Sequence, residues 1–289
     1  MANQNHIQNL SGLLIATLLI STSGVLGKYI DMPTEVVIWF RSAFATVVLF
    51  AFCRFKKVNL KVHHTKTHIP LVISSVFMAA HWITYFYALK LSNVALGMLS
   101  LYTFPVITSL LEPIFLKTKL KPIHILLGII VLIGLFIATP EFDLESSELQ
   151  GILFGVLSAI CYAIRILILK QQVESYDGSM LMLYQTTFIT ILLFPVLFFM
   201  DLSSFQAELP FLLTLGIVTT AMGHSLMIRS LKFFSASTAT IISSIQPIFG
   251  TLLAFLFVGD IPVLNTYIGG AVILSTVVIE SIRSKKESS

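Results

Sequence analysis

The stretch from residue 125 to residue 138 reads ILLGIIVLIGLFIA and carries no charged side chain. Its apolar residues do not alternate with polar ones, as the strands of a membrane β-barrel would require. Lipid offers no partners to bare backbone N–H and C=O groups, so a segment of this kind spans a membrane as an α-helix, which satisfies those groups internally. The stretch therefore predicts a transmembrane helix, to which we assign residues 123–140.

Nine further apolar segments of similar length lie along the chain, and each is about long enough to cross ~30 Å of hydrocarbon as a helix. The composition agrees, because 56% of the 289 residues are hydrophobic and only 11% are charged, against ~25% charged residues in soluble domains. An ordinary soluble enzyme, a disordered chain and a coiled coil are excluded. We expect an all-α integral membrane protein with ten transmembrane helices, at residues 10–30, 35–53, 70–90, 94–116, 123–140, 150–170, 180–200, 210–228, 236–258 and 264–282.

The sequence lacks the motifs of several kinds of metal-binding and catalytic site. The two cysteines, Cys53 and Cys161, lie inside apolar segments and form no CxxC pair, which argues against a disulfide scaffold or a zinc module. The sequence has no Walker loop, no GxSxG and no HExxH motif, so we expect no direct use of ATP, no enzyme activity, no metal and no cofactor. The first segment lacks a basic leader and is too long for a signal peptide, so we expect no cleavage.

The net charge of +4 lies in short blocks between apolar segments, which is not the pattern of a nucleic-acid-binding surface. If the N-terminus is cytoplasmic, 14 of the 18 basic residues fall on the cytoplasmic side: Arg54, Lys56, Lys57, Lys61, Lys66, Lys117, Lys119, Lys121, Lys170, Arg229, Lys232, Arg283, Lys285 and Lys286. An excess of Lys and Arg on one side of the membrane determines how the helices are oriented across it. We expect both termini in the cytoplasm and, because neither terminus suggests organelle targeting, a bacterial cytoplasmic membrane.

The chain is similar to itself at an offset of 142. Residues 88–116 align with residues 230–258 with six identities, among them Lys90 with Lys232 and Pro105 with Pro247. We therefore predict two units of five helices each, residues 1–145 and 146–289. Five is an odd number, so the second unit enters the membrane from the opposite side, and the repeat is inverted. Many secondary transporters are built in this way, with the substrate site between the two halves.

Several stretches resemble the drug/metabolite transporter superfamily, of the type with two EamA-like repeats. They are a small-residue first helix ending in a lysine, an arginine-bearing second helix, a tight turn after the third helix, and paired proline helices: Ser21–Lys28, Trp39–Ala45, Tyr87–Gly97, Tyr102–Pro105 and Ile245–Ala254. The resemblance covers about residues 10–282. It implies a transporter, most often an exporter, of small polar metabolites such as amino acids, working by alternating access through exchange or a gradient.

Polar side chains inside predicted membrane helices are candidates for a substrate cavity. Arg41 would suit a substrate carboxylate or phosphate, and Gln185 is its uncharged partner in the second repeat. His81 and Tyr85 share a helix face at i, i+4 spacing, and His224 lies near the matching point of the second repeat. The histidines would line a cavity or relay protons; packing residues are the alternative.

Tyr102 and Gln246 are weaker candidates of the same kind, beside the two prolines. Pro105 and Pro247 each remove one backbone hydrogen bond from mid-helix, so each predicted helix should kink or loosen there. The prolines would be hinges next to the cavity or passive kinks. Because they stand at equivalent places in both repeats, we favour hinges.

Glu112 and Arg165 are charges inside predicted membrane helices. A carboxylate in hydrocarbon costs on the order of 3 kcal/mol on insertion scales, so Glu112 needs a partner or a proton. Each residue lies five positions before a lysine at the cytoplasmic end of its helix, Lys117 or Lys170, so the two charges are expected at similar depth. Three interpretations stay open: an ion pair between them, a protonatable Glu112 that couples transport to pH, and separate snorkelling to the cytoplasm.

Other functions also stay open at this point. The chain could be an uptake permease for a nucleoside or a carboxylate, or a non-transporting scaffold or sensor for lipid head groups. The expected partners are a small-molecule substrate and membrane lipids, with a homodimer as a further option and no nucleic acid.

Overall fold

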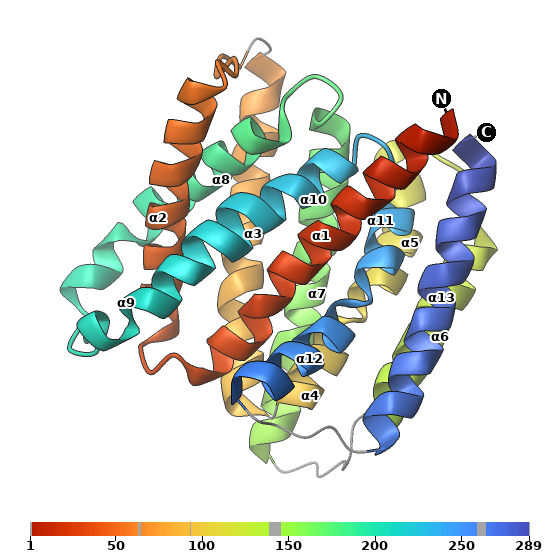
Figure 1. Ribbon diagram of the computed structural model, residues 1–289. Coiled ribbons are helices and arrows are strands. Elements are labelled where there is room, and N and C mark those ends of the chain that lie inside the picture. The colour runs from red at the N-terminus through yellow and green to blue at the C-terminus, as the bar shows by residue number, and fades with distance from the viewer. Residues whose placement is uncertain (1, 63–64, 93, 139–145, 259–263, 289) are drawn as a thin grey trace.

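The structure is a computed structural model, and it describes residues 2–62, 65–92, 94–138, 146–258 and 264–288. Within these ranges the chain is nearly all helical and contains no strand (Figure 1). The helices are α1 (Ala2–Tyr29), α2 (Thr34–Phe55), α3 (Thr65–Leu91), α4 (Val94–Leu101), α5 (Phe104–Leu116), α6 (Pro122–Ala138), α7 (Ser146–Gln172), α8 (Gly178–Leu193), the 3₁₀-helix η1 (Phe194–Phe198), α9 (Phe205–Thr214), the π-helix η2 (Leu215–His224), α10 (Ser225–Ser230), α11 (Ala236–Ser243), α12 (Gln246–Val258) and α13 (Leu264–Ser288).

The expected all-α membrane architecture is confirmed. Eight of the described helical stretches are long and apolar enough to cross a membrane, and two shorter apolar helices, Phe104–Leu116 and Pro122–Gly134, accompany them. Many large apolar side chains are exposed along these helices, for example Val47, Phe55, Ile114 and Phe199. Such a surface suits lipid rather than water. The predicted boundary between the two units, near residue 145, lies outside the described residues.

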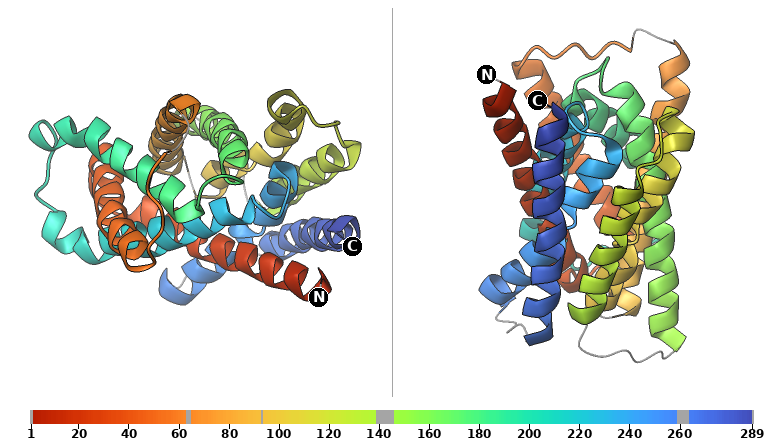
Figure 2. Two further views of the ribbon diagram at one scale, coloured as in Figure 1. Left: turned by 90° about the horizontal axis from the view of Figure 1, so that it is seen from above. Right: turned by 90° about the vertical axis from the view of Figure 1, so that its right-hand side faces the viewer.

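The contacts between helices can be set beside the predicted repeat, which stays a prediction. The repeat relates the second helix to the seventh and the fifth to the tenth, and α2 packs against α8 while α6 packs against α13 (Figures 1 and 2). It also relates the first helix to the sixth and the third to the eighth. The repeat therefore converts the pair of third and sixth helices into the pair of eighth and first helices. Both pairs are in contact, as α3 with α7 and as α1 with η2. These contacts all cross between the halves, so the interior of the bundle is a surface shared by both.

Two predicted membrane helices are broken at equivalent places. The fourth divides into α4 and α5 at residues 102–103, and the ninth divides into α11 and α12 at residues 244–245. Pro105 and Pro247 each stand second in the following helix. Because proline has no N–H, the carbonyl four residues earlier loses its helical donor, and the chain tightens to shorter bonds such as that from Ser244 N to Ile241 O. The expected loosening at both prolines is confirmed.

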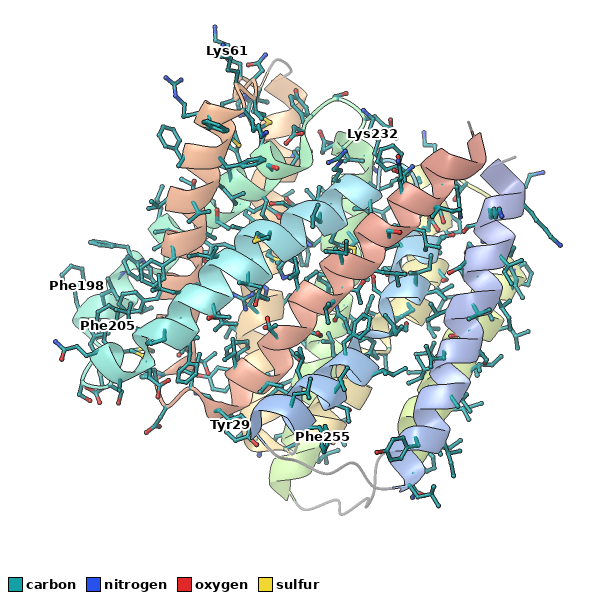
Figure 3. All side chains as sticks on the ribbon, in the orientation of Figure 1. Tyr29, Lys61, Phe198, Phe205, Lys232 and Phe255 are labelled. Carbon is teal, nitrogen blue, oxygen red and sulfur yellow. The ribbon has the colours of Figure 1, made fainter. Side chains whose placement is uncertain are left out.

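One end of the bundle carries both chain termini and the connection between α2 and α3 (Figure 2). The side chains of Lys61 and Lys232 lie at this same end, whereas Tyr29 and Phe255 lie toward the other (Figure 3). The position of these two lysines at one end agrees with the prediction that most basic residues lie on one side. We name this end of the bundle the terminal end. Its assignment to the cytoplasm stays a prediction from the charge bias.

The surroundings of Glu112 contradict two of its three interpretations, an ion pair with Arg165 and snorkelling to the cytoplasm. Its side chain is only 7% exposed, so it does not snorkel to water. It accepts hydrogen bonds from the backbone N–H groups of Ala236, at 2.8 Å, and Ser237, at 3.2 Å, and from the Ser237 hydroxyl. The predicted ion pair with Arg165 does not form, because Arg165 instead binds the side-chain oxygen of Gln185.

The Glu112 carboxylate therefore acts as a cap for the N-terminus of α11, supplied from the other half of the chain. A helix N-terminus leaves N–H groups without partners and carries partial positive charge, and a carboxylate satisfies both. Nearby, Glu280 of α13 accepts hydrogen bonds from Thr238 and Arg283, and its oxygen lies 3.4 Å from His124 Nε2. These bonds join α5, α6, α11 and α13 near the terminal end.

The membrane orientation can be tested by labelling single cysteines. In a chain without Cys53 and Cys161, Lys61→Cys and Lys286→Cys should resist an impermeant thiol reagent in intact cells. Gln206→Cys, exposed at the opposite end, should react with it. Labelling of Lys61→Cys from outside would reverse the orientation of every later helix.

Glu112→Ala should destabilise the protein, because it leaves buried N–H groups at the start of α11 without partners, at a cost of about 1–3 kcal/mol. Melting temperature and monodisperse yield in detergent measure the effect. Since no ion pair with Arg165 exists, the exchange Glu112→Arg with Arg165→Glu should not restore stability. Glu174→Ala, which removes an exposed carboxylate, serves as the control. A restored yield in the exchange variant would contradict the capping role.

Candidate functional site

A narrow cavity lies at the centre of the bundle, where the first broken helix faces α1, α3, α7, η2 and the start of α12. Its volume is about 30 Å³, which is room for a water-sized ligand only. A metabolite therefore needs the surrounding helices to separate. The cavity is lined by Ile20, Ser21, Ser23, Gly24, His81, Trp82, Tyr85, Met98, Leu101, Tyr102, Phe104, Tyr162, His224 and Gln246.

The structure brings most of the predicted site residues together. His81, Tyr85, Tyr102, His224 and Gln246, which come from both halves, all line the cavity. The two other candidates, Arg41 and Gln185, are fully buried but lie behind its wall.

The two helix breaks are joined directly to each other. The Tyr102 hydroxyl donates a hydrogen bond of 2.5 Å to Gln246 Oε1. Tyr102 lies in the break between α4 and α5, and Gln246 is the first residue of α12. Because each residue belongs to a different half, this bond holds the halves together across the cavity.

The hydrogen bonds of His81 determine which ring nitrogen carries its proton. Nδ1 lies 2.7 Å from Ser158 Oγ and 3.3 Å from the Ser158 carbonyl oxygen, while Ser158 Oγ itself donates to the His81 carbonyl, at 2.9 Å. A carbonyl only accepts, and the serine proton is already used, so Nδ1 is the donor. The other nitrogen, Nε2, is left as an acceptor.

The guanidinium of Arg41 lies against the cavity wall from behind. Its central carbon is 4.0 Å from the ring centroid of Trp82, close enough for a cation–π contact. Nε donates to the Thr220 hydroxyl at 3.1 Å, and Nη1 approaches the Ser23 hydroxyl at 3.5 Å. Trp82 in turn meets His224 edge to face, with ring centroids 5.6 Å apart.

Arg165 takes a similar place on α7. It donates to Gln185 Oε1 from Nη2 at 2.9 Å and from Nε at 3.3 Å, and Gln185 Nε2 donates to Ser74 Oγ. Its central carbon is 5.6 Å from the ring centroid of Tyr162. Tyr162 stacks at a tilt on His81, with centroids 4.6 Å apart. Two parallel constructions result, and we call each an arginine–aromatic–histidine stack: Arg41–Trp82–His224 and Arg165–Tyr162–His81.

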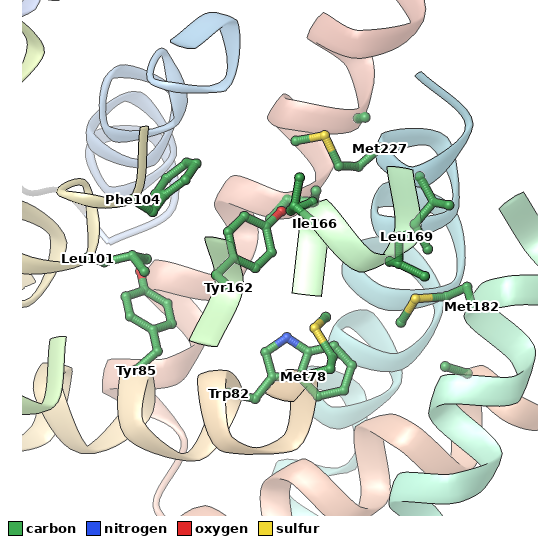
Figure 4. Packing of buried hydrophobic residues seen from close by; sticks show 14 of the residues in the cluster. Met78, Trp82, Tyr85, Leu101, Phe104, Tyr162, Ile166, Leu169, Met182 and Met227 are labelled. Carbon is green, nitrogen blue, oxygen red and sulfur yellow. The ribbon is translucent and has the colours of Figure 1, made fainter. Parts of the chain in front are cut away.

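Sequence reasoning missed the place of Arg165, Trp82, Tyr162 and Ser158 in this site. Figure 4 shows Trp82 and Tyr85 rising from α3 toward Tyr162 of α7, with Leu101 and Phe104 above Tyr85 in this view. A signal was present, because Ser158, Tyr162 and Arg165 recur at spacings of four and three and so share one face of a helix. Nothing in the spacing tells which neighbour that face meets.

Comparison with known proteins identifies the family. The model of the EamA-like transporter family matches twice, at residues 9–139 and 149–281. The chain belongs to the EamA-like transporter family. The expected membership of the drug/metabolite transporter superfamily is thereby confirmed, and this protein is a multi-pass membrane transporter. A transporter moves its solute without converting it, which agrees with the expectation that the chain is not an enzyme.

Individual relatives are distant but cover the whole chain. It is 25% identical to the pseudopaline exporter CntI of Pseudomonas aeruginosa, over 96% of this chain and 97% of that one. It is 24% identical to an S-adenosylmethionine uptake transporter of Rickettsia conorii, over 99% and 96%. A solved crystal structure with 17% sequence identity superposes with a TM-score of 0.80, over 98% of this chain and 99% of the other, and supports the same fold.

His81→Ala and Gln246→Ala should each reduce transport without reducing the amount of protein in the membrane. The expected loss is about tenfold, the effect of one lost hydrogen bond to a charged ligand. Initial flux in proteoliposomes measures it. Tyr184→Phe is the matched control, since it removes a hydroxyl whose hydrogen bond to the Leu60 carbonyl lies outside the cavity. Normal flux in both alanine variants would remove these residues from the site.

Proposed function

We propose that this chain is a secondary transporter that exports small polar metabolites, amino acids among them, from the bacterial cytoplasm by alternating access. The observation that carries the proposal is the narrow cavity between the two broken helices. Binding sites of inverted-repeat transporters favour such interrupted helices at the interface of the halves. Hydroxyl, imidazole and amide groups stand among the apolar side chains of its lining, and they offer hydrogen bonds to a polar solute.

Transport requires the cavity to open to each side in turn. The bond between Tyr102 and Gln246 holds the two breaks together when the cavity is closed. Binding of a solute that hydrogen-bonds these side chains replaces that bond and allows the halves to rock apart. The missing backbone bonds at Pro105 and Pro247 provide places where α5 and α12 bend. Since the sequence has no Walker loop, solute exchange or an ion gradient supplies the energy.

The direction of transport is part of the proposal. Relatives of this chain are named for export in one case and for uptake in another. We favour export because the superfamily resemblance implies it most often. Uptake is the alternative outcome of the same experiment. Membership of a transporter family argues against the scaffold or sensor for lipid head groups.

The direction of transport can be tested in cells that produce this protein and are fed dipeptides. Hydrolysis of the dipeptides inside these cells raises their content of free amino acids. Export predicts that amino acids leave these cells faster than cells with the Gln246→Ala variant. Radiolabelled counterflow into proteoliposomes then shows transport by the pure protein. Faster accumulation from the medium, with unchanged efflux, would support the uptake alternative instead.

Pro105→Ala should slow turnover more than it weakens substrate binding. The variant restores a backbone donor at the break between α4 and α5 and so stiffens the predicted hinge. Maximal flux should fall while the concentration for half-maximal flux changes little. Pro113→Ala, in the same helix one turn before its end, is the matched control for loss of a proline. Equal effects of the two variants would contradict a special role for Pro105.

A further inference from the structure

Two arginines are buried near the centre of this membrane protein. Arg41 and Arg165 are both 0% exposed. An arginine side chain keeps its charge in proteins, so burial does not neutralise it. Each guanidinium therefore needs compensation from an anion, or it stays an uncompensated charge in the bundle.

No carboxylate of the described chain supplies that compensation. The ion pairs among the described residues join Glu174 to Lys170, and Glu280 to His124 and Arg283. Glu112, the buried acid that could have paired with Arg165, caps α11 instead. The partners of the two arginines are neutral: hydroxyls for Arg41, and an amide, a thioether and the Tyr162 hydroxyl for Arg165.

Each guanidinium also keeps one nitrogen without a hydrogen bond to the described residues, Nη2 in Arg41 and Nη1 in Arg165. Both atoms are shielded from solvent. More than nine in ten buried polar groups in proteins have a partner. Eight buried side-chain atoms of the described residues have no such bond, and two of them belong to the two buried cations. What sets these two apart is the positive charge, for which the described residues supply no anion.

Both arginines reach the cavity through the same construction. Arg41 lies against Trp82 and Arg165 lies near Tyr162, and both rings line the cavity. Each guanidinium is thus one side chain away from it. The lining residues themselves include no acid and no base other than the two histidines. When the cavity widens and these rings shift, a solute inside it meets two cations and no negative charge.

We propose that the transported solute carries a carboxylate, which binds between Arg41 and Arg165 when the cavity opens. The planar fork of a guanidinium matches the two oxygens of a carboxylate. His81, with its proton on Nδ1, offers Nε2 as an acceptor for an ammonium or hydroxyl group of the same solute. The inference rests on the proposed transport function and names the substrate class for that site.

The two tryptophans of the chain, Trp39 and Trp82, provide a test that needs no knowledge of the substrate. Trp39 bonds the Thr190 carbonyl and does not line the cavity, so Trp39→Phe leaves Trp82 as a reporter beside Arg41. Trp82 is 1% exposed, so any quencher reaches it only when the cavity opens. Quenching by iodide, an anion, is therefore compared with quenching by caesium, a cation of similar size, at constant ionic strength. The proposal expects iodide to quench more than caesium, and adding Arg41→Gln should lower the iodide effect severalfold.

Arg54→Gln is the matched control, since Arg54 is an exposed arginine on the same helix, and it should leave both quenchers unchanged. Quenching by iodide that does not exceed quenching by caesium in the Trp39→Phe protein would overturn the proposal. This comparison stands even if Arg41→Gln fails to fold, because it uses the native arginines.

A transport assay tests the substrate class directly. Proteoliposomes are loaded with the twenty protein amino acids, L-leucinamide, putrescine and uridine, and the solutes that leave are measured by mass spectrometry. The proposal expects carboxylates to leave and L-leucinamide, putrescine and uridine to stay. Arg41→Gln and Arg165→Gln should each lower the carboxylate rate about tenfold or more, and the lysine variants, which keep charge but lose the fork, by less.

The outcomes separate the two proposals. Release of putrescine or uridine, or unchanged carboxylate rates in both glutamine variants, would overturn the carboxylate site while leaving transport established. If no solute leaves, the proposed function fails for these metabolites, and the iodide comparison still decides whether the cavity attracts anions.

Discussion

Every feature of this protein depends on one constraint: inside a lipid bilayer, a backbone N–H or C=O group without a partner is costly. Because of this constraint the chain is helical, and a helix is interrupted only where other protein groups can satisfy the freed backbone. The described chain interrupts two membrane helices at equivalent points, beside Pro105 and Pro247. Both breaks lie within the bundle next to the central cavity, where protein groups rather than lipid surround the freed backbone.

The same constraint explains how the protein treats its buried charges. Glu112 is buried in the bundle but satisfies three donors at the start of α11, so its charge and the helix end compensate each other. Glu280 is compensated by Arg283, at 2.5 Å. These acids join the halves near the terminal end. Arg41 and Arg165, in contrast, have neutral partners, and each keeps one nitrogen without a hydrogen bond to the described residues. The buried charges that are compensated stabilise the bundle, and we assign the two uncompensated ones to the solute.

The helices around the cavity are closely packed. The interior is crowded enough that a Cβ on Gly155 of α7 would overlap Ser100 of α4, so only glycine permits this approach. In the closed form the cavity admits little more than water. The proposed function requires such a wall to open to one side and then to the other, rather than to form a permanent channel. The single bond between Tyr102 and Gln246 across the breaks is weak enough to yield to a solute.

The sequence by itself determined the helices, their number, the positions of the prolines and the family. These follow from hydrophobic runs, charge bias and local motifs, which act within one segment and need no knowledge of its neighbours. It also predicted His81, Tyr85, Tyr102, His224 and Gln246 as candidates for a polar cavity, and these side chains line one. Their role in binding a solute stays a prediction.

Only the tertiary structure decided which partners the buried charges have. The spacing to Lys117 and Lys170 predicts similar depth for Glu112 and Arg165, but Glu112 turns toward α11 and Arg165 toward Gln185. Likewise, the repeat relates Arg41 to Gln185, whereas packing makes Gln185 the partner of Arg165. Helix rotation depends on the packing of all neighbouring side chains together, and a pattern along one segment does not contain it.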